Sequence, residues 1–265
     1  MKSKIGGLIG LTMLGVLHSA MAWGSSLGYY LVSADGGVFA FGDVAFHGST
    51  ASVQLTKPIV GMDATPDGKG YWLVGSDGGI FAFGDAAFYG STASVQLTKP
   101  IAGMDATPDG KGYWLVGSDG GMFAFGDAAF YGSTASVQLT KPIVGMDATP
   151  DGKGYWLVGA DGGIFAFGDA AYYGSTANVQ LTSPIVGMDA TPDGKGYWLA
   201  SADGGIFAFG DATFLGGLGG TVLSASVVGI DAVSLAPTRI PEPATLSLLG
   251  LGLFSIGVMR RRKTN

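Results

Sequence analysis

Aspartate is the side chain best able to do chemistry in this chain, and it recurs at fixed spacing. Nineteen of the 20 acidic residues fall at four positions that repeat every 42 residues, such as Asp77, Asp85, Asp105 and Asp109. Carboxylates could bind calcium, which takes about six to eight oxygen ligands, or act as acid and base in glycoside hydrolysis. The chain has no Cys, which excludes thiolate metal sites and thiol nucleophiles.

A structural interpretation competes at each of the four positions. Asp77 and Asp67 precede Gly, where Asp caps its own backbone in a tight turn. Asp85 and Asp63 lie beside apolar strands, and we expect their types to bond backbone amides that hold adjacent copies together. No loop has the spaced D-x-D-x-D-G run of a calcium site. We therefore predict no metal and no cofactor, with calcium as the alternative.

Catalysis has little support from the repeated positions. Glycoside hydrolysis needs two carboxyl groups in unlike environments, whereas near-identical copies place each Asp in similar ones, and the repeats contain no Glu. His47 corresponds to Tyr or Leu in the other copies, which favours a surface ring over a catalyst. We predict a protein that is not an enzyme, and a glycan hydrolase remains the alternative.

Binding is the better prospect, because each copy combines Tyr, Trp and Asp. Aromatic faces stack on sugar rings, and carboxylates accept bonds from sugar hydroxyls. Trp72 and its equivalents lie in predicted strands, so we expect them in the core. The candidate ligand-binding residues are Tyr89, Tyr131, Tyr173, Asp85, Asp127 and Asp169. This pattern resembles five-bladed lectins that carry one sugar site per blade.

The elements that must position these residues repeat five times. The copies begin at Gly28, Gly70, Gly112, Gly154 and Gly196. Within one copy, strands are predicted at 59–65, 70–76, 80–84 and 86–91, because apolar and aromatic runs alternate with turn residues. Pro66-Asp67-Gly68 and Asp77-Gly78-Gly79 are the predicted turns between the first three strands.

A 42-residue period with four short strands is typical of a β-propeller blade. The inner strands are apolar on both faces, as in sheets that are covered on both sides. The series opens on a second strand at Gly28 and ends at 227–232, which matches the first strand at 59–64. We therefore predict an all-β, five-bladed propeller over 28–237, with four-stranded blades and a ring closed by the C-terminal strand. A linear array of the same blades is the alternative.

The N-terminus has the order of a secretory signal. Two lysines precede an apolar run, and Ala20 and Ala22 fit an A-x-A cleavage site. We predict a signal peptide at 1–22 and a short leader at 23–27. The formal net charge of −6 argues against a nucleic-acid partner.

The C-terminus, 238–265, has three parts in order. Pro241, Glu242 and Pro243 precede an apolar segment at 244–259, and Arg260, Arg261 and Arg262 follow it. This order resembles the PEP-CTERM sorting signal of Gram-negative bacteria. The resemblance implies export across the inner membrane, transient anchoring through 244–259, and processing by an exosortase. It also implies a host that makes extracellular polysaccharide.

These observations predict an exported protein of the cell surface or the exopolysaccharide matrix. Its expected role is that of a scaffold or a multivalent binder, with extracellular polysaccharide as the ligand class. A purely structural repeat protein without a ligand is a further alternative.

Overall fold

The computed structural model describes residues 28–220, 227 and 230, and this part of the chain contains strands, turns and loops. The predicted signal peptide at 1–22, the leader at 23–27 and the sorting signal at 238–265 lie outside the described residues. Within the described part, no helix is long and apolar enough to cross a membrane.

The described residues form fourteen strands that follow the repeat, and each copy uses the same segments for them. The inner strands are β3 (Ile59–Ala64), β6 (Ile101–Ala106), β9 (Ile143–Ala148) and β12 (Ile185–Ala190). The middle strands are β1 (Gly28–Val32), β4 (Gly70–Gly75), β7 (Gly112–Gly117), β10 (Gly154–Gly159) and β13 (Gly196–Ser201). The outer strands are β2 (Val38–Gly42), β5 (Ile80–Gly84), β8 (Met122–Gly126), β11 (Ile164–Gly168) and β14 (Ile206–Gly210).

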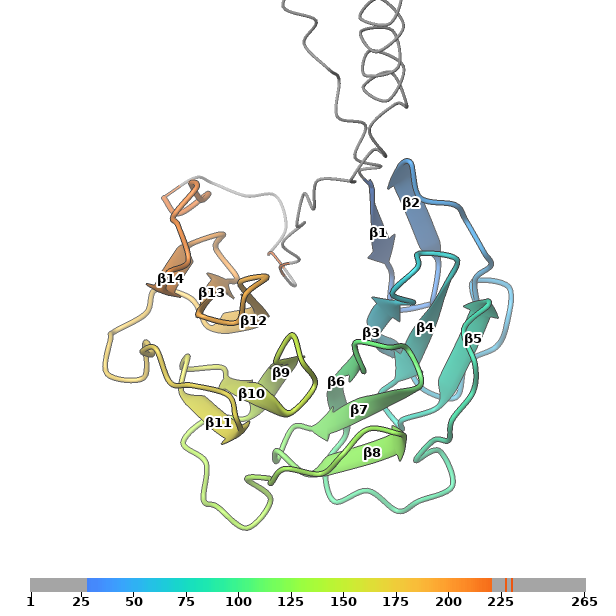
Figure 1. Ribbon diagram of the computed structural model, residues 1–265, viewed down its shortest axis with the longest axis horizontal. Helices are drawn as coiled ribbons and strands as arrows, with labels where there is room; N and C mark the ends of the chain where they lie inside the picture. Colours follow the sequence, from blue (N-terminus) through green and yellow to red (C-terminus); the bar gives the residue numbers. More distant parts are fainter. Residues whose placement is uncertain (1–27, 221–226, 228–229, 231–265) are drawn as a thin grey trace, which may run out of the picture. The chain divides into compact units, whose positions relative to one another are not determined.

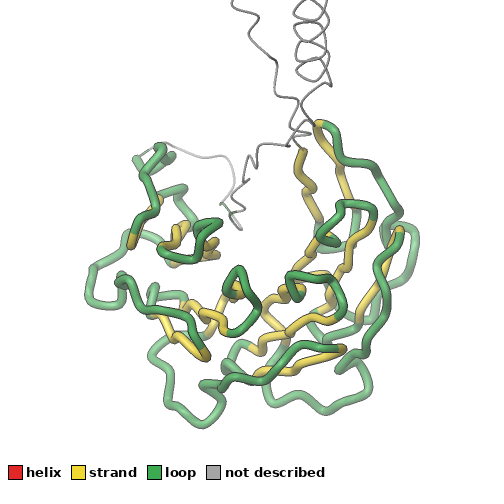
Figure 2. Tube along the Cα trace, in the orientation of Figure 1, coloured by secondary structure: helices red, strands yellow, loops and turns green. Residues whose placement is uncertain are grey.

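The strands form five separate antiparallel sheets in chain order (Figure 1). Sheet 1 contains β1 and β2, and sheets 2 to 5 each contain an inner, a middle and an outer strand. The inner strands of neighbouring sheets from sheet 2 to sheet 5 contact one another. Long loops join β2, β5, β8 and β11 to the inner strand that follows each of them (Figure 2). The prediction of an all-β repeat is therefore confirmed.

Both predicted turns are present, and their aspartates cap them. In the hairpin between β4 and β5, Asp77 Oδ1 accepts a bond from Gly79 N at 3.0 Å. Gly78 has a φ of +76°, and a Cβ there would lie 1.7 Å from Thr92 Oγ1, so only Gly fits. In the turn between β3 and β4, Asp67 Oδ1 accepts a bond from Lys69 N at 3.2 Å.

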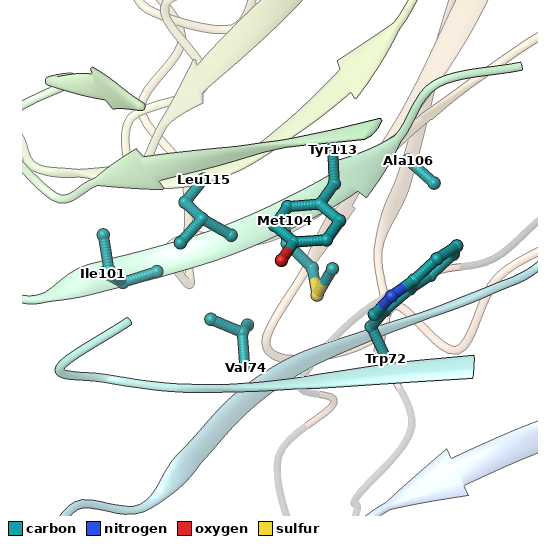
Figure 3. Packing of buried hydrophobic residues seen from close by; sticks show 7 residues of the cluster. All are labelled: Trp72, Val74, Ile101, Met104, Ala106, Tyr113 and Leu115. Atoms are coloured by element: carbon teal, nitrogen blue, oxygen red, sulfur yellow. The ribbon is translucent and has the colours of Figure 1, made fainter. Parts of the chain in front are cut away.

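The core lies between successive sheets rather than within one of them. Trp72 and Val74 of β4 point toward Tyr113 and Leu115 of β7, and Met104 of β6 packs between them (Figure 3). All six residues of β4 are buried, because sheets on either side cover it. The sequence predicted that the apolar strand at 70–76 is covered on both faces, and this prediction is correct for β4.

The sheets differ from the prediction in strand number. Sheets 2 to 5 have three strands, and the predicted fourth strand at 86–91 is a loop. Side chains take the backbone groups that a ladder would use: Trp72 Nε1 donates to Ala87 O at 2.7 Å, and the Tyr113 hydroxyl bonds Gly90. Gly90 also has a φ of +142°, which lies outside the strand region. The apolar residues at 86–91 predicted a strand because these side-chain bonds cannot be recognised in the sequence.

Candidate functional site

Tyrosines of the middle strands tie each sheet to the loop of the sheet before it. The Tyr113 hydroxyl donates to Gly90 O at 2.6 Å and accepts from Tyr89 N and Gly90 N at 3.1 and 3.0 Å. Tyr71, Tyr155 and Tyr197 repeat this arrangement. Burial raises the pKa of Tyr113. The repeated bonds give loop 86–91 and its equivalents one fixed conformation.

The three candidate ligand-binding tyrosines lie in these loops and are partly buried. The Tyr89 hydroxyl donates to Gly110 O, in the turn between β6 and β7 of the next sheet, at 2.9 Å, and its ring meets Tyr113 edge-on with centroids 5.7 Å apart. Tyr131 and Tyr173 make the equivalent bonds to Gly152 and Gly194. These tyrosines therefore bridge adjacent sheets, and ligand binding by them stays a prediction.

The candidate aspartates of the same loops are exposed. Asp85 Oδ1 accepts a bond from Thr65 Oγ1 at 3.2 Å, and Asp127 and Asp169 pair with Thr107 and Thr149 in the same way. The expectation that the Asp85 type bonds backbone amides to hold neighbouring sheets together is wrong, because its partner is a side-chain hydroxyl in the same sheet. Asp85 therefore bonds within its own sheet, whereas Tyr89 bonds the next sheet along the chain.

The aspartates of the inner strands do join adjacent copies, as predicted. Ala106 N donates to Asp63 Oδ2 at 2.6 Å, and the same bond links Ala148 to Asp105 and Ala190 to Asp147 at 2.5 Å. Each carboxyl is partly buried and lies near the carboxyl of the next sheet.

Burial raises the pKa of Asp63 and Asp105 well above the usual range, and the neighbouring carboxylate raises each further. For Asp147, burial and the charge of Asp189 raise the pKa to about 7. The side chain of Asp105 interacts with that of Asp63 on one side and with that of Asp147 on the other. These carboxyl groups hold the sheets together, and among the described residues no cluster of three His, Asp or Glu could hold a metal ion.

The tryptophans are core residues in three of the four sheets that carry them. Trp72, Trp114 and Trp156 are fully buried, and each donates its Nε1 to a loop carbonyl at 2.7 Å. Trp198 of sheet 5 is only partly buried. The expectation that Trp72 belongs to the core is confirmed.

His47 occupies the loop position of Tyr89 in the first copy. Its ring is partly buried and packs edge-on against Tyr71 with centroids 5.6 Å apart. Its Nε2 is buried without a hydrogen-bond partner among the described residues. The surface position expected for this ring is therefore only partly realised.

Sequence reasoning missed the exposed ring that directly precedes each bridging Tyr. One such ring occurs in every copy, with 59–62% of its surface accessible. These five residues, which we call the outer rings, are Phe46, Phe88, Phe130, Tyr172 and Phe214. The sequence did contain a signal for these rings. In an extended chain, adjacent side chains point to opposite sides, so two neighbouring aromatic residues such as Phe88 and Tyr89 cannot both pack inward.

The comparisons with known proteins concern the C-terminal segment. Residues 239–263 match the family model of the PEP-CTERM protein-sorting motif. This chain carries a PEP-CTERM sorting motif. The motif implies export, transient membrane anchoring and processing by an exosortase. No curated protein matches the sequence.

Proposed function

We propose that this chain is a non-enzymatic exported repeat protein that acts at the cell surface or in the exopolysaccharide matrix as a multivalent binder of polysaccharide. The observation that carries the proposal is the repetition of the same inter-copy bonds at successive junctions. Because these bonds fix each copy in the same way, the exported body presents the same surface several times. Repetition of one weak site on a rigid body raises overall affinity about 10²- to 10⁴-fold.

The proposed body is a five-bladed propeller closed by the C-terminal strand. Val227 N donates to Ala202 O at 2.9 Å. The same bond begins each inner strand, as when Ile185 N donates to Ala160 O at 2.9 Å. Val227 therefore occupies the position at which an inner strand begins in the earlier copies, and sheet 1 is the sheet that has no inner strand among the described residues.

The faces at the two ends of the series support closure. Leu31 and Phe39 of sheet 1 are 53% and 55% exposed, whereas the equivalent Leu73 is fully buried against the preceding sheet. Trp198 of sheet 5 is partly exposed, unlike its buried equivalents. Sheets 1 and 5 thus carry the two halves of the interface that the inner junctions bury, and ring closure would cover both.

Calorimetric titration tests this function. The processed protein, purified from the producing cells, is titrated with oligomers of their own exopolysaccharide, with and without calcium. We expect saturable heat at about five sites per chain, with no shortening of the oligomers over hours. Shortened oligomers would identify a hydrolase and overturn the proposal. Absence of heat would leave the repeats with a purely structural role and would also overturn it.

A further inference from the structure

Each copy presents one flat aromatic ring to solvent on a rigid support. In the second copy, Phe88 is 62% exposed. The residue before it, Ala87, is held through its carbonyl by Trp72 Nε1 at 2.7 Å. The residue after it, Tyr89, is held through its N–H by the Tyr113 hydroxyl at 3.1 Å. The backbone is thus bonded on both sides of the ring, so little loop entropy remains to be lost on binding.

The outer rings persist where the residues around them change. In the last copy, Leu215 replaces the bridging Tyr, and Thr213 replaces the Ala before the ring. In the first copy, His47 replaces that Tyr, and Tyr30 stands at the position of the buried Trp. Phe46 and Phe214 nevertheless remain, and both are about as exposed as Phe88. A residue that served only to pack the loop would be buried, so the common feature of this position is an accessible aromatic face.

An exposed carboxylate lies three residues before each ring. Asp85 is exposed, and Thr65 is the one described side chain that bonds it, through Oδ1. Asp127 and Asp169 repeat this arrangement beside Phe130 and Tyr172. Every copy of this loop in sheets 2 to 4 therefore offers a flat apolar face together with a hydrogen-bond acceptor, the two features that one face and one hydroxyl of a pyranose would engage.

Isolation and charge indicate what kind of ligand fits. None of the outer rings makes an aromatic contact with another described residue, so each is a single platform rather than part of a contiguous aromatic patch. A contiguous patch is typical of a protein partner, whereas separate identical platforms suit a ligand that itself repeats. The repeats carry 19 Asp against seven Lys, so an anionic chain would be repelled.

We propose that the outer rings are the stacking platforms of a polysaccharide whose sugar units carry no acidic group, with Asp85 and its equivalents accepting bonds from sugar hydroxyl or amino groups. This inference rests on the proposed binding function and names its contacts and its ligand class. It moves the principal contact from the bridging tyrosines, whose hydroxyls bond the next sheet, to the residue before them. One site per copy also fits the expected stoichiometry.

The test compares two sets of variants of the processed protein in a titration with cello-oligosaccharides and chitosan oligomers. In the first set, Phe88→Ala, Phe130→Ala and Tyr172→Ala are combined. The matched control combines Val95→Ala, Val137→Ala and Val179→Ala, which remove equally periodic apolar side chains that are 51–53% exposed. Because all six side chains are exposed, both variants should keep the thermal midpoint of the wild type.

We expect the first variant to lose at least about tenfold in apparent affinity, since losing three of five sites removes most of the avidity. The valine control should bind like the wild type. A third variant, with Leu at the same three positions, should bind as weakly as the Ala variant, because Leu is apolar but offers no flat face. A fourth variant that combines Phe88→Tyr and Phe130→Tyr should bind like the wild type, because Tyr172 already stands at this position.

The outcomes separate this inference from the function on which it rests. If the wild type binds and the Ala or Leu variant binds equally well, the rings are not the platforms, while the binding function stands. If the wild type binds only acidic polysaccharides, the ligand class is wrong. If it binds no oligomer at all, including those of the host's exopolysaccharide, the binding function itself is overturned.

Discussion

The inner-strand carboxyl groups should make this protein less stable as the pH rises from about 4 to 7. Asp147 has a pKa of about 7 in the folded chain, because burial and the charge of Asp189 disfavour its ionised form. In the unfolded chain, the pKa returns to about 3.8. The folded state therefore binds more protons across this interval, and its stability falls as the pH rises through it.

The magnitude follows from the two pKa values. Each pKa unit corresponds to about 1.4 kcal/mol, so a rise from 3.8 to about 7 corresponds to about 4 kcal/mol of unfolding free energy lost by pH 7. The exposed Asp151 has the opposite effect, because Lys153 lowers its pKa to about 2. Its contribution is lost only as the pH falls from about 4 toward 2, so we expect maximal stability near pH 4.

Asp147→Asn should make this slope shallower, while Asp63 and Asp105, whose pKa values burial also raises, keep the remainder. The amide oxygen can still accept the bond from Ala190 N, but the side chain no longer titrates. The free energy of unfolding is measured by urea denaturation at pH 4, 5, 6 and 7, with tryptophan fluorescence as the signal. The matched control is Asp169→Asn, which changes an exposed carboxylate of the same sheet and should keep the wild-type slope.

Two results would refute the reasoning. The first is a wild-type free energy of unfolding that stays level or rises between pH 4 and 7. The second is an Asp147→Asn variant that keeps the full wild-type slope while the control also keeps it, because Asp147 would then contribute nothing to the slope.

Three further substitutions test the contacts between copies and within turns. Tyr113→Phe should destabilise the chain by about 1–3 kcal/mol in urea denaturation, because Gly90 loses the hydroxyl that satisfies its N–H and carbonyl; an unchanged midpoint would contradict this. Gly78→Ala should prevent folding or lower the thermal midpoint sharply, because its Cβ would clash with Thr92 Oγ1; circular dichroism after refolding would show it, and a native spectrum with an unchanged midpoint would disprove the clash. Lys111→Ala should leave the urea midpoint nearly unchanged, since its ion pair is largely exposed, and a clear loss of stability would contradict this.

Much of the local structure follows from residue types and their order. Pro66-Asp67-Gly68 and Asp77-Gly78-Gly79 specify turns that form where predicted, because Gly permits a positive φ and Asp bonds the amide two residues on. The apolar runs between these turns became β3, β4 and β5 with nearly the predicted bounds. The matched sorting motif at 239–263 was also readable from residue order alone.

The loop at 86–91 shows where this reasoning failed. Its aromatic residues predict a strand, yet the loop's backbone is bonded by Trp72 from its own sheet and Tyr113 from the next. Local propensity contains no information about a partner 24 residues away, so tertiary contacts decided the conformation. The same contacts made Tyr89 a bridge between sheets and left Phe88 in solvent.

The sequence by itself determined the repeat, the turns, the paired strands and the sorting signal, because each depends on residues that are close together in the chain. Only the tertiary structure decided the roles of chemically identical side chains in different copies and positions. Asp63 and Asp85 have the same carboxyl group, but one bonds the backbone of the next sheet and the other lies in solvent. The physical reason is that burial, partner and charge come from neighbouring copies, and their placement depends on how the sheets pack.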